Sequence, residues 1–445
     1  MVPDLRAESA AMPYVDGAEF LGADQLQMVQ QAGWEEQSRA VLDRSPLFRR
    51  HLAGHRLPEA LDDLPLLPTC DKELLRASQR DHPPFGDYLA APVEAVNRLH
   101  RTSGTTGQAM NLALSPSDAE ITAAVGGRCQ SAAGLGPGHR VIHCLNYQMW
   151  MGGLTDHMTL ERTGALVVPF GVGSTELLVQ TIRELGIDAI SCTPSYPGVI
   201  ERVIAERFPG LAPRDLGLRL GLFGGEPGLD SPALRQRLRE TWGLEPRNAN
   251  YGVSDVFCNF AGQCAQDTDL HYMAADVLYP ELIDPQTMSP VAIEEGSSGE
   301  LVLTHLERQC QPLIRFRTGD IVAVTGTGPC RCGRTGFRFR VVGRSDDMVV
   351  VRGINVFPTM IAAVIDTVLG LSGEYRIVLE GTGPYDRLPV EAECAANVPA
   401  APELARQVAA AIQRAIRVTA EVTVVPHGAL PRTAGKTRRV IRKDI

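Results

Sequence analysis

The sequence predicts an α/β protein in which a large N-terminal domain with mostly parallel sheets and flanking helices precedes a small α+β C-terminal domain. From about residue 140 to about residue 310, short β-rich apolar runs alternate with helical patterns, which is typical of a parallel sheet covered by helices. Gly-Arg-Ser-Asp-Asp at residues 343–347 interrupts two apolar runs and marks a boundary. The stretch of about 100 residues beyond it is long enough for a small domain.

The first elements are predicted from apolar periodicity. Residues 24–51 contain few helix breakers and predict a helix. The central strands are predicted at Arg140–Leu145, Ala165–Phe170, Ala189–Cys192 and Leu218–Phe223. Between the second and third of these strands, Ser174 can cap a helix with an apolar face, and Gly186 can end it.

The C-terminal domain is predicted from three strands and one helix. The strands are Arg376–Glu380, Leu388–Cys394 and Ala420–Val425. Apolar residues at every fourth position from Leu404 to Ile416 predict an amphipathic helix. We expect the N-terminal domain to cover residues 1–343 and the C-terminal domain residues 348–445, with residues 344–347 between them.

Composition narrows the function. The 445 residues are 44% hydrophobic and 21% charged, which excludes wholesale disorder and a fibrous fold. A net charge of −9 argues against nucleic acid as the main partner. No apolar run approaches the roughly 20 residues that span a bilayer, and no secretory signal is visible, so we expect a cytoplasmic protein without a membrane partner. Ten cysteines are too few for a disulfide scaffold and indicate reduced thiols or a metal site.

The segment Arg101-Thr102-Ser103-Gly104-Thr105-Thr106-Gly107-Gln108 could bind phosphate. Its two glycines allow a tight turn and a close approach to a ligand, while hydroxyl and backbone N–H groups can face phosphate oxygens. The lysine of a Gly-x4-Gly-Lys-Ser/Thr loop is missing. Taken alone, the segment is equally compatible with an ordinary turn.

Further motifs follow this loop in order. They are Gly224-Gly225-Glu226-Pro227, Asn250-Tyr251-Gly252-Val253-Ser254-Asp255, Arg317-Thr318-Gly319-Asp320, Gly343-Arg344-Ser345-Asp346-Asp347, Arg352-Gly353-Ile354-Asn355-Val356-Phe357-Pro358 and Leu430-Pro431-Arg432-Thr433-Ala434-Gly435-Lys436. With these motifs the sequence resembles the adenylate-forming enzymes, which comprise acyl-CoA synthetases, adenylation domains and luciferases. It is most similar to the phenylacetate-CoA ligase branch, through Leu64 to Gly107 and Arg344 to Pro358.

The resemblance implies a reaction in two halves. A carboxylate attacks the α-phosphate of ATP, which releases pyrophosphate and forms an acyl-AMP, and a thiol, usually that of CoA, then displaces AMP. Because an anion must attack a polyanion, cations and N–H dipoles must be placed on the phosphates. We therefore expect ATP, Mg²⁺ and CoA as cofactors and an aromatic carboxylic acid as substrate.

The resemblance also implies roles for residues of the large domain. The loop from Thr102 to Gly107 would hold the β- and γ-phosphates. Tyr251 would offer a flat face to adenine, Ser254 would face the α-phosphate, and Asp255 would bind Mg²⁺, which prefers oxygen ligands. The residues expected to line the adenine and acyl-adenylate groove are Gly225, Glu226, Pro227 and Asn250.

In the C-terminal motifs, Asp320 would accept hydrogen bonds from both ribose hydroxyls, and Arg344 would lie over ribose or phosphate. Lys436 would bridge the carboxylate and the α-phosphate as a mobile cation. Taken alone, Asp320 is compatible with a turn and Lys436 with an exposed basic tail. Family members rotate the small domain about a hinge at the position of Asp346, so this domain is expected to be mobile. One orientation brings in Lys436, and the other brings in Gly353 beside the pantetheine arm of CoA.

A second constellation suits a metal. Three thiols and one imidazole come from Cys264-x6-His271 and Cys330-Arg331-Cys332-Gly333. This is a ligand set for a closed tetrahedral zinc site, although unligated buried thiols are the alternative and Cys258 and Cys310 are reserve ligands. Since some members of the resembled branch carry a structural zinc, we expect structural Zn²⁺ without a catalytic role.

The segment Tyr147-Gln148-Met149-Trp150-Met151-Gly152-Gly153 is similar to the acyl-pocket wall of aryl-CoA ligases. Tyr147 and Trp150, together with Gly224, suit a flat aromatic acid, although ordinary core is the alternative for Trp150 and the methionines. Benzoate-, anthranilate-, hydroxyanthranilate-, cinnamate- and arylacetate-type acids all stay open.

Two alternatives stay open, and two departures from the family pattern motivate the second of them. Gln108 stands where the family loop usually ends in lysine, and Asp255 stands where the family usually has glutamate. One alternative is a stand-alone adenylating enzyme of secondary metabolism that delivers the acyl group to a carrier protein or another nucleophile. The other is a nucleotide-binding protein that has lost turnover. Relatives of this branch are commonly dimers, but the sequence shows no interface signature.

Overall fold

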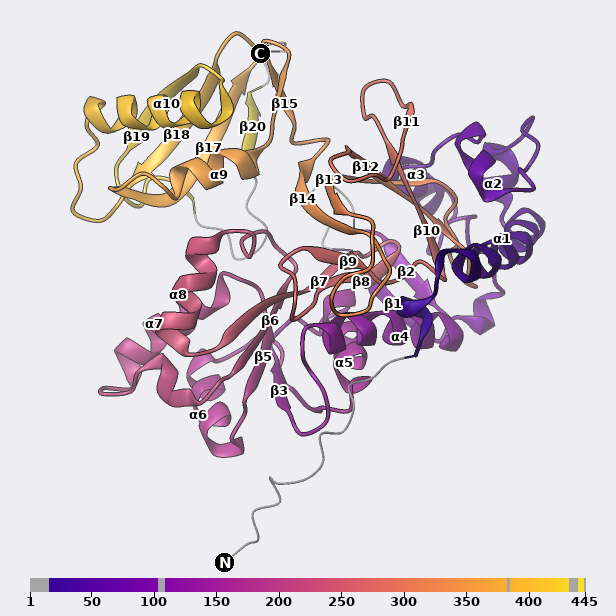
Figure 1. The fold of residues 1–445 in the computed structure, drawn as a ribbon, viewed down its shortest axis with the longest axis horizontal. Coiled ribbons are helices and arrows are strands. Elements are labelled where there is room, and N and C mark those ends of the chain that lie inside the picture. Colours follow the sequence, from indigo (N-terminus) through magenta and orange to yellow (C-terminus); the bar gives the residue numbers. More distant parts are fainter. Residues whose placement is uncertain (1–15, 103–108, 382–384, 432–438, 444–445) are drawn as a thin grey trace, which may run out of the picture. The chain divides into compact units, whose positions relative to one another are not determined.

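The computed structural model describes residues 16–102, 109–381, 385–431 and 439–443 (Figure 1). The chain forms two compact units. The first comprises Met1–Thr318 and Val324–Arg340, and the second comprises Gly319–Ala323 and Val341–Ile445. Among the described helices, none is both long and apolar enough to cross a membrane.

The core of the first unit is a run of parallel strands in the order β4-β3-β5-β6-β7. Their bounds are β3 (Arg140–His143), β4 (Leu166–Pro169), β5 (Ala189–Cys192), β6 (Leu220–Gly224) and β7 (Glu245–Val253). The predicted α/β class and the four predicted strands of this region are confirmed, with ends that shift by at most two residues.

Seven further strands extend this sheet beyond β7. In sheet order they are β8 (Phe257–Gln263), β9 (Leu270–Tyr272), β14 (Arg338–Arg344), β13 (Phe316–Gly326), β12 (Ser298–His305), β10 (Leu278–Ile283) and β11 (Pro290–Val291). β8 pairs antiparallel with β7, and β9 pairs antiparallel with β8. The direction of the sheet therefore changes at the turn between β7 and β8, where the predicted residues Ser254 and Asp255 lie.

Helices cover both faces of the parallel strands. The bounds are α4 (Pro116–Ala132), α5 (Met151–Glu161), α6 (Thr175–Leu185), α7 (Tyr196–Arg207) and α8 (Pro232–Trp242). Because side chains alternate along a strand, Ile142 packs with residues of α6, α7 and α8, whereas its neighbour Val141 packs with Leu160 of α5. The predicted helix caps are confirmed, since Ser174 Oγ accepts from Leu177 N and Gly186 has a φ of 59°.

The N-terminal segment corrects one prediction. Residues 24–51 form two helices, α1 (Ala23–Arg44) and α2 (Pro46–His51), in place of one. Pro46 has no backbone N–H to continue α1, and Ser45 instead caps α2 by accepting from Phe48 N. The remaining elements of this region are α3 (Lys72–Asp81), β1 (Arg98–Arg101), β2 (Asn111–Leu114) and the 3₁₀ turns η1 (Ala18–Phe20), η2 (Leu61–Leu66), η3 (Val93–Ala95) and η4 (Pro213–Leu216).

The second unit contains a four-stranded sheet in the order β19-β18-β17-β20. The bounds are β17 (Leu371–Glu380), β18 (Leu388–Cys394), β19 (Ala420–Val425) and β20 (Val440–Lys443), with a hairpin of β15 (Val349–Val351) and β16 (Ile354–Val356) and helices α9 (Pro358–Ile365) and α10 (Pro402–Ile416). The predicted apolar stripe of α10 is confirmed, because Leu404, Val408, Ile412 and Ile416 are buried. This unit therefore has its own core.

Candidate active site

Two predicted motifs lie side by side at the end of the parallel strands. β6 ends at Gly224, which is in register with Asn250 of β7. A Cβ atom on Gly224 would lie 2.4 Å from the carbonyl oxygen of Asn250, so this close approach requires glycine. Gly225 has a φ of 81°, and the next residue, Glu226, accepts a hydrogen bond from Ser195 N at 2.8 Å. The loop after β6 is thus held against the neighbouring strand ends, where ligands bind in open α/β sheets.

The aromatic ring of Tyr251 is fixed by two edge-to-face contacts. Its centroid lies 5.2 Å from that of Phe260 and 5.5 Å from that of Phe339. The side chain remains partly exposed. A flat ring supported in this way can stack against a second flat group, which agrees with the role predicted for adenine.

Asp255 lies in the turn after β7 and is 6% exposed. Its Oδ2 is 2.9 Å from Nζ of Lys72, which is the first residue of α3 and follows the helix cap Asp71. Its Oδ1 is buried and has no hydrogen-bond partner in the described part of the chain. A buried carboxylate oxygen without a donor is suited to a hard cation such as Mg²⁺.

Lys72 was missed by the sequence analysis. It lies within the segment Leu64 to Gly107 that carries the family likeness, but 183 positions before Asp255. Nothing in local spacing pairs two residues so far apart. The signal that could have indicated Lys72 was its position directly after the helix-capping Asp71, within the segment that carries the family likeness.

The predicted phosphate loop is described only at its edges. Thr102 and Met110 close it, since Thr102 N donates to Met110 O at 3.0 Å and Met110 N donates to Thr102 Oγ1 at 2.9 Å. Residues Ser103, Gly104, Thr105, Thr106, Gly107 and Gln108 lie outside the described residues. Arg101 N donates to Met149 O at 2.7 Å, which links the start of this loop to the segment before α5.

That segment carries the predicted acyl-pocket residues. The hydroxyl of Tyr147 is 2.9 Å from Nδ1 of His157, and burial raises the pKa of Tyr147. Trp150 precedes α5 and is 44% exposed, and Met149 is 46% exposed, whereas Met151 is buried. Met151 is therefore ordinary core, whereas Met149 and Trp150 are not.

The second unit holds Asp320, Arg344 and Asp346 together. Arg344 Nη1 donates to Asp320 Oδ1 at 2.9 Å, and Arg344 Nε donates to Asp346 Oδ1 at 2.9 Å. Burial acts to lower the pKa of Arg344, but these carboxylates raise it above its ordinary value. Gly353 lies in the hairpin between β15 and β16 with a φ of 80°, a backbone conformation that favours glycine. Lys436 lies outside the described residues.

The four predicted metal ligands come together. One ligand atom from each of Cys264, His271, Cys330 and Cys332 lies within 4.8 Å of all the others. Cys264 directly follows β8, His271 lies on β9, and the other two occupy the turn between β13 and β14. The reserve candidates Cys258 and Cys310 are not part of the group.

The spacing within this group suits zinc. Cys264 Sγ is 3.9 Å from Cys330 Sγ, and Cys332 Sγ is 3.6 Å from His271 Nε2. A tetrahedral zinc with Zn–S bonds of about 2.3 Å places two sulfurs about 3.8 Å apart. The Cys264 thiol donates to the sulfur of Cys332, and this lowers the pKa of Cys332 against the opposing effect of burial. The donor set and its distances therefore fit the metal.

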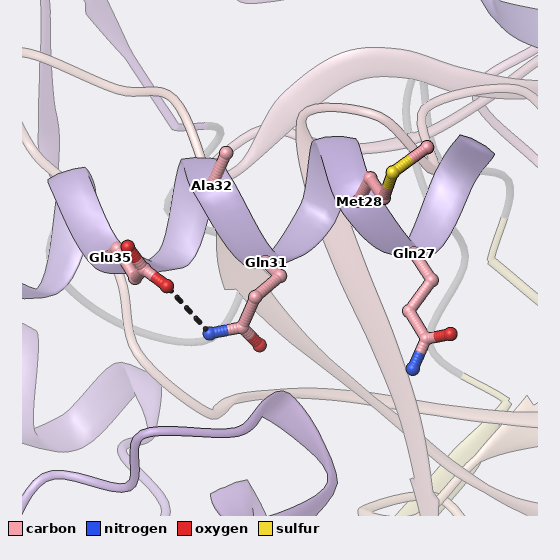
Figure 2. Close-up of a pocket in the computed structure, with 5 residues that line it drawn as sticks. All are labelled: Gln27, Met28, Gln31, Ala32 and Glu35. Atoms are coloured by element: carbon pink, nitrogen blue, oxygen red, sulfur yellow. Dashed lines mark hydrogen bonds between the residues drawn. The ribbon is translucent and has the colours of Figure 1, made fainter. Parts of the chain in front are cut away.

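A hollow elsewhere on the first unit is not part of this site. It is lined by Gln27, Met28, Gln31, Ala32 and Glu35, all from α1 (Figure 2). Gln31 Nε2 donates to Glu35 Oε1 at 3.3 Å. The hollow contains none of the predicted site residues, so it carries no catalytic assignment.

Comparison with known proteins identifies the family. Residues 353–443 match the AMP-binding enzyme C-terminal domain. The chain is 33% identical to a phenylacetate-coenzyme A ligase of Thermus thermophilus, over 97% of this chain and 99% of the relative. It is 34% identical to a phenylacetate-coenzyme A ligase of Pseudomonas putida, over 97% of both chains.

The structure of a 2-hydroxyisobutyryl-CoA ligase in the postadenylation state is also similar, with a TM-score of 0.85 and 28% identity. The similarity covers 100% of this chain and 94% of that one. The alignments therefore extend over both units. The chain belongs to the phenylacetate-coenzyme A ligase branch of the adenylate-forming enzymes, a branch of AMP-forming acid–CoA ligases.

Proposed function

We propose that this protein uses ATP to convert an aromatic carboxylic acid to an aryl-AMP and then transfers the acyl group to the thiol of CoA, which releases AMP. The observation that carries this proposal is the similarity along nearly the whole chain to relatives named phenylacetate-coenzyme A ligase. The half-buried Tyr147 and the exposed Trp150 before α5 support a flat substrate. The aromatic class is proposed from these two observations together.

The first unit would supply the contacts to the triphosphate. We assign Asp255 to Mg²⁺ through its unpartnered Oδ1. When bound, this ion supplies positive charge that offsets the charge of the phosphates. Nζ of Lys72 lies 2.9 Å from the other oxygen of Asp255. We therefore assign Lys72 the second positive charge of the site, which compensates for the lysine that Gln108 replaces in the phosphate loop.

For the remaining nucleotide contacts we propose the roles that the family resemblance implies. Tyr251 faces adenine, Ser254 faces the α-phosphate, and the loop from Gly225 to Pro227 lines the adenylate groove. In the second unit, Asp320 binds the ribose, Asp346 is the hinge, and Lys436 acts in adenylation. The contacts of Arg344 with both Asp320 and Asp346 support a shared role for this cluster in nucleotide binding and hinge motion.

We also propose that Cys264, His271, Cys330 and Cys332 hold structural Zn²⁺. The ion would connect the end of β8 and strand β9 to the turn between β13 and β14. Its ligands are protein side chains throughout, which is typical of a closed structural site and leaves no open position for a substrate.

Acid-dependent pyrophosphate release tests the proposed function. Purified protein with ATP and Mg²⁺ would be given benzoate, phenylacetate, cinnamate and their hydroxy and amino derivatives, with 2-hydroxyisobutyrate as an aliphatic comparison. We expect release with at least one aryl acid and little with the aliphatic acid. Release with the aliphatic acid alone would overturn the aromatic class, and no release with any acid would favour a protein that has lost turnover.

A further inference from the structure

A buried carboxylate that has no place in the mechanism above lies beside the predicted acyl-pocket residues. Asp156 lies on α5 and is 2% exposed. Asn250 Nδ2 donates to its Oδ2 at 2.6 Å, whereas its Oδ1 is buried and has no hydrogen-bond partner in the described residues. The thiol of Cys258 also hydrogen-bonds this carboxylate, but within the described residues no arginine, lysine or histidine forms an ion pair with it. Buried carboxylates are usually paired and fully hydrogen-bonded, so this one requires an explanation.

The neighbours of Asp156 place it at the predicted substrate groove. Its partner Asn250 is partly exposed and touches Gly224, where β6 ends. A Cβ atom on Gly152, in the segment that carries Tyr147 and Trp150, would lie 3.4 Å from Asp156 Oδ2. The charge of Asp156 also acts on Tyr147, whose pKa it helps to raise after the larger effect of burial. Two segments assigned to the groove thus lie against this carboxylate, and the third, the end of β6, lies against its partner Asn250.

The chemistry of the carboxylate limits what it can bind. The substrate brings its own carboxylate, which Asp156 would repel, so Asp156 must face a different part of the acid. An ionised carboxylate only accepts hydrogen bonds. Burial raises the pKa of Asp156 from 3.8 to about 6, so the group is largely ionised at neutral pH. Its unpartnered oxygen is therefore an acceptor for a hydroxyl or amino hydrogen.

We propose that Asp156, oriented by Asn250, determines specificity by accepting a hydrogen bond from a hydroxyl or amino substituent on the ring of the aromatic acid. This inference rests on the proposed function and names the substrate class: a hydroxy- or amino-substituted aryl acid, not an unsubstituted one. A site with a buried acceptor discriminates strongly against an analogue without the donor, because that acceptor is then left unsatisfied. A buried water on Oδ1 is the competing explanation.

The test compares matched acids that differ only in the substituent. kcat/KM for pyrophosphate release would be measured with benzoate and phenylacetate and with their hydroxy and amino derivatives at each ring position. We expect the best substituted acid to exceed its unsubstituted parent by about 100-fold or more. The variant Asp156→Asn keeps the shape of the side chain and loses the charged acceptor. We expect it to reduce this ratio at least tenfold while changing kcat/KM for the unsubstituted acid far less.

The controls separate this inference from folding and from the proposed function. Asp43→Asn makes the same chemical change on an exposed residue of α1 and should leave the ratio unchanged. Thermal unfolding of each variant checks that it folds, and Asn250→Ala should reduce the ratio in the same direction. A wild-type preference for unsubstituted acids, or an equal loss for both acids in Asp156→Asn, would overturn the inference and leave the proposed function standing. If none of the acids supports pyrophosphate release, both the inference and the proposed function are overturned.

Discussion

Two buried carboxylates of the first unit differ in how their charge is compensated. Asp255 lies 2.9 Å from the ammonium group of Lys72, whereas Asp156 has neutral partners, the amide of Asn250 at 2.6 Å and the thiol of Cys258. A nearby cation favours the ionised form of a carboxylate, while burial disfavours it. We assign these two similar side chains different tasks from this difference: Asp255 would bind a cation, and Asp156 would accept a hydrogen bond from a neutral donor.

The largest effect is expected from Asp255→Asn. This change removes the charge assigned to Mg²⁺ and leaves Lys72 without its partner. We expect acid-dependent adenylation to slow on the order of 100-fold, as when one group that stabilises a transition state is removed. Pyrophosphate exchange at saturating Mg²⁺ measures this, with Asp43→Asn as the control. If Asp255→Asn adenylates at the wild-type rate, Asp255 has no part in the chemistry.

A smaller effect is expected from Lys72→Met. It leaves the buried charge of Asp255 unpaired, and because Lys72 is 35% exposed the cost to stability should stay at about 1–2 kcal/mol. We expect kcat/KM for ATP to fall about tenfold through loss of one phosphate cation. Lys72→Arg should recover most of both losses. If Met and Arg behave alike in both assays, the charge of Lys72 is not what matters.

Asp156→Asn should raise the stability of the protein at alkaline pH, whereas Lys72→Met lowers it. Because the pKa of Asp156 is raised to about 6, its favourable contribution is present below pH 3.8 and is lost as the pH rises through about 6. Asparagine does not ionise, so the variant does not lose stability as the pH rises. At pH 8 it should therefore be more stable than wild type by about 1–3 kcal/mol. At pH 4 the gain should be absent. Denaturation at both pH values measures this, and equal effects at the two would contradict the assignment of an uncompensated charge.

The smallest effect on turnover is expected from a change in the proposed zinc site. This site contains neither Asp255 nor Asp156, so it serves as a reference for both. Cys332→Ser should reduce the bound zinc, measured by elemental analysis, and lower the unfolding temperature by several degrees. Below that temperature, kcat for adenylation should change less than about threefold. A loss of adenylation in a folded, zinc-depleted variant would give the metal a role that we exclude.

Much of the fold followed from local patterns. The strands at Ala189–Cys192, Leu388–Cys394 and Ala420–Val425 were predicted to the residue, because the first is a short, mostly apolar run and the other two largely alternate apolar with polar residues. The prediction of one helix over residues 24–51 was wrong. It relied on apolar periodicity and gave too little weight to Pro46, which has no backbone N–H to continue the first helix. The antiparallel strands beyond β7 depend on long-range pairing, which periodicity does not report.

The site was predictable where one motif carries one task. The grouping of Cys264, His271, Cys330 and Cys332 followed from residue types whose chemistry is narrow. Lys72 and Asp156 were missed because their meaning comes from contacts with residues 183 and 94 positions away. A single lysine or aspartate in a helix is ordinary until its burial and its partner are known.

Mass spectrometry of the product tests the central claim most directly. The protein would be incubated with ATP, Mg²⁺, CoA and the aryl acid that best supports pyrophosphate release. The account predicts an aryl-CoA thioester, with AMP and pyrophosphate formed in equal amounts. An aryl-AMP that accumulates in the presence of CoA, with no thioester formed, would contradict it.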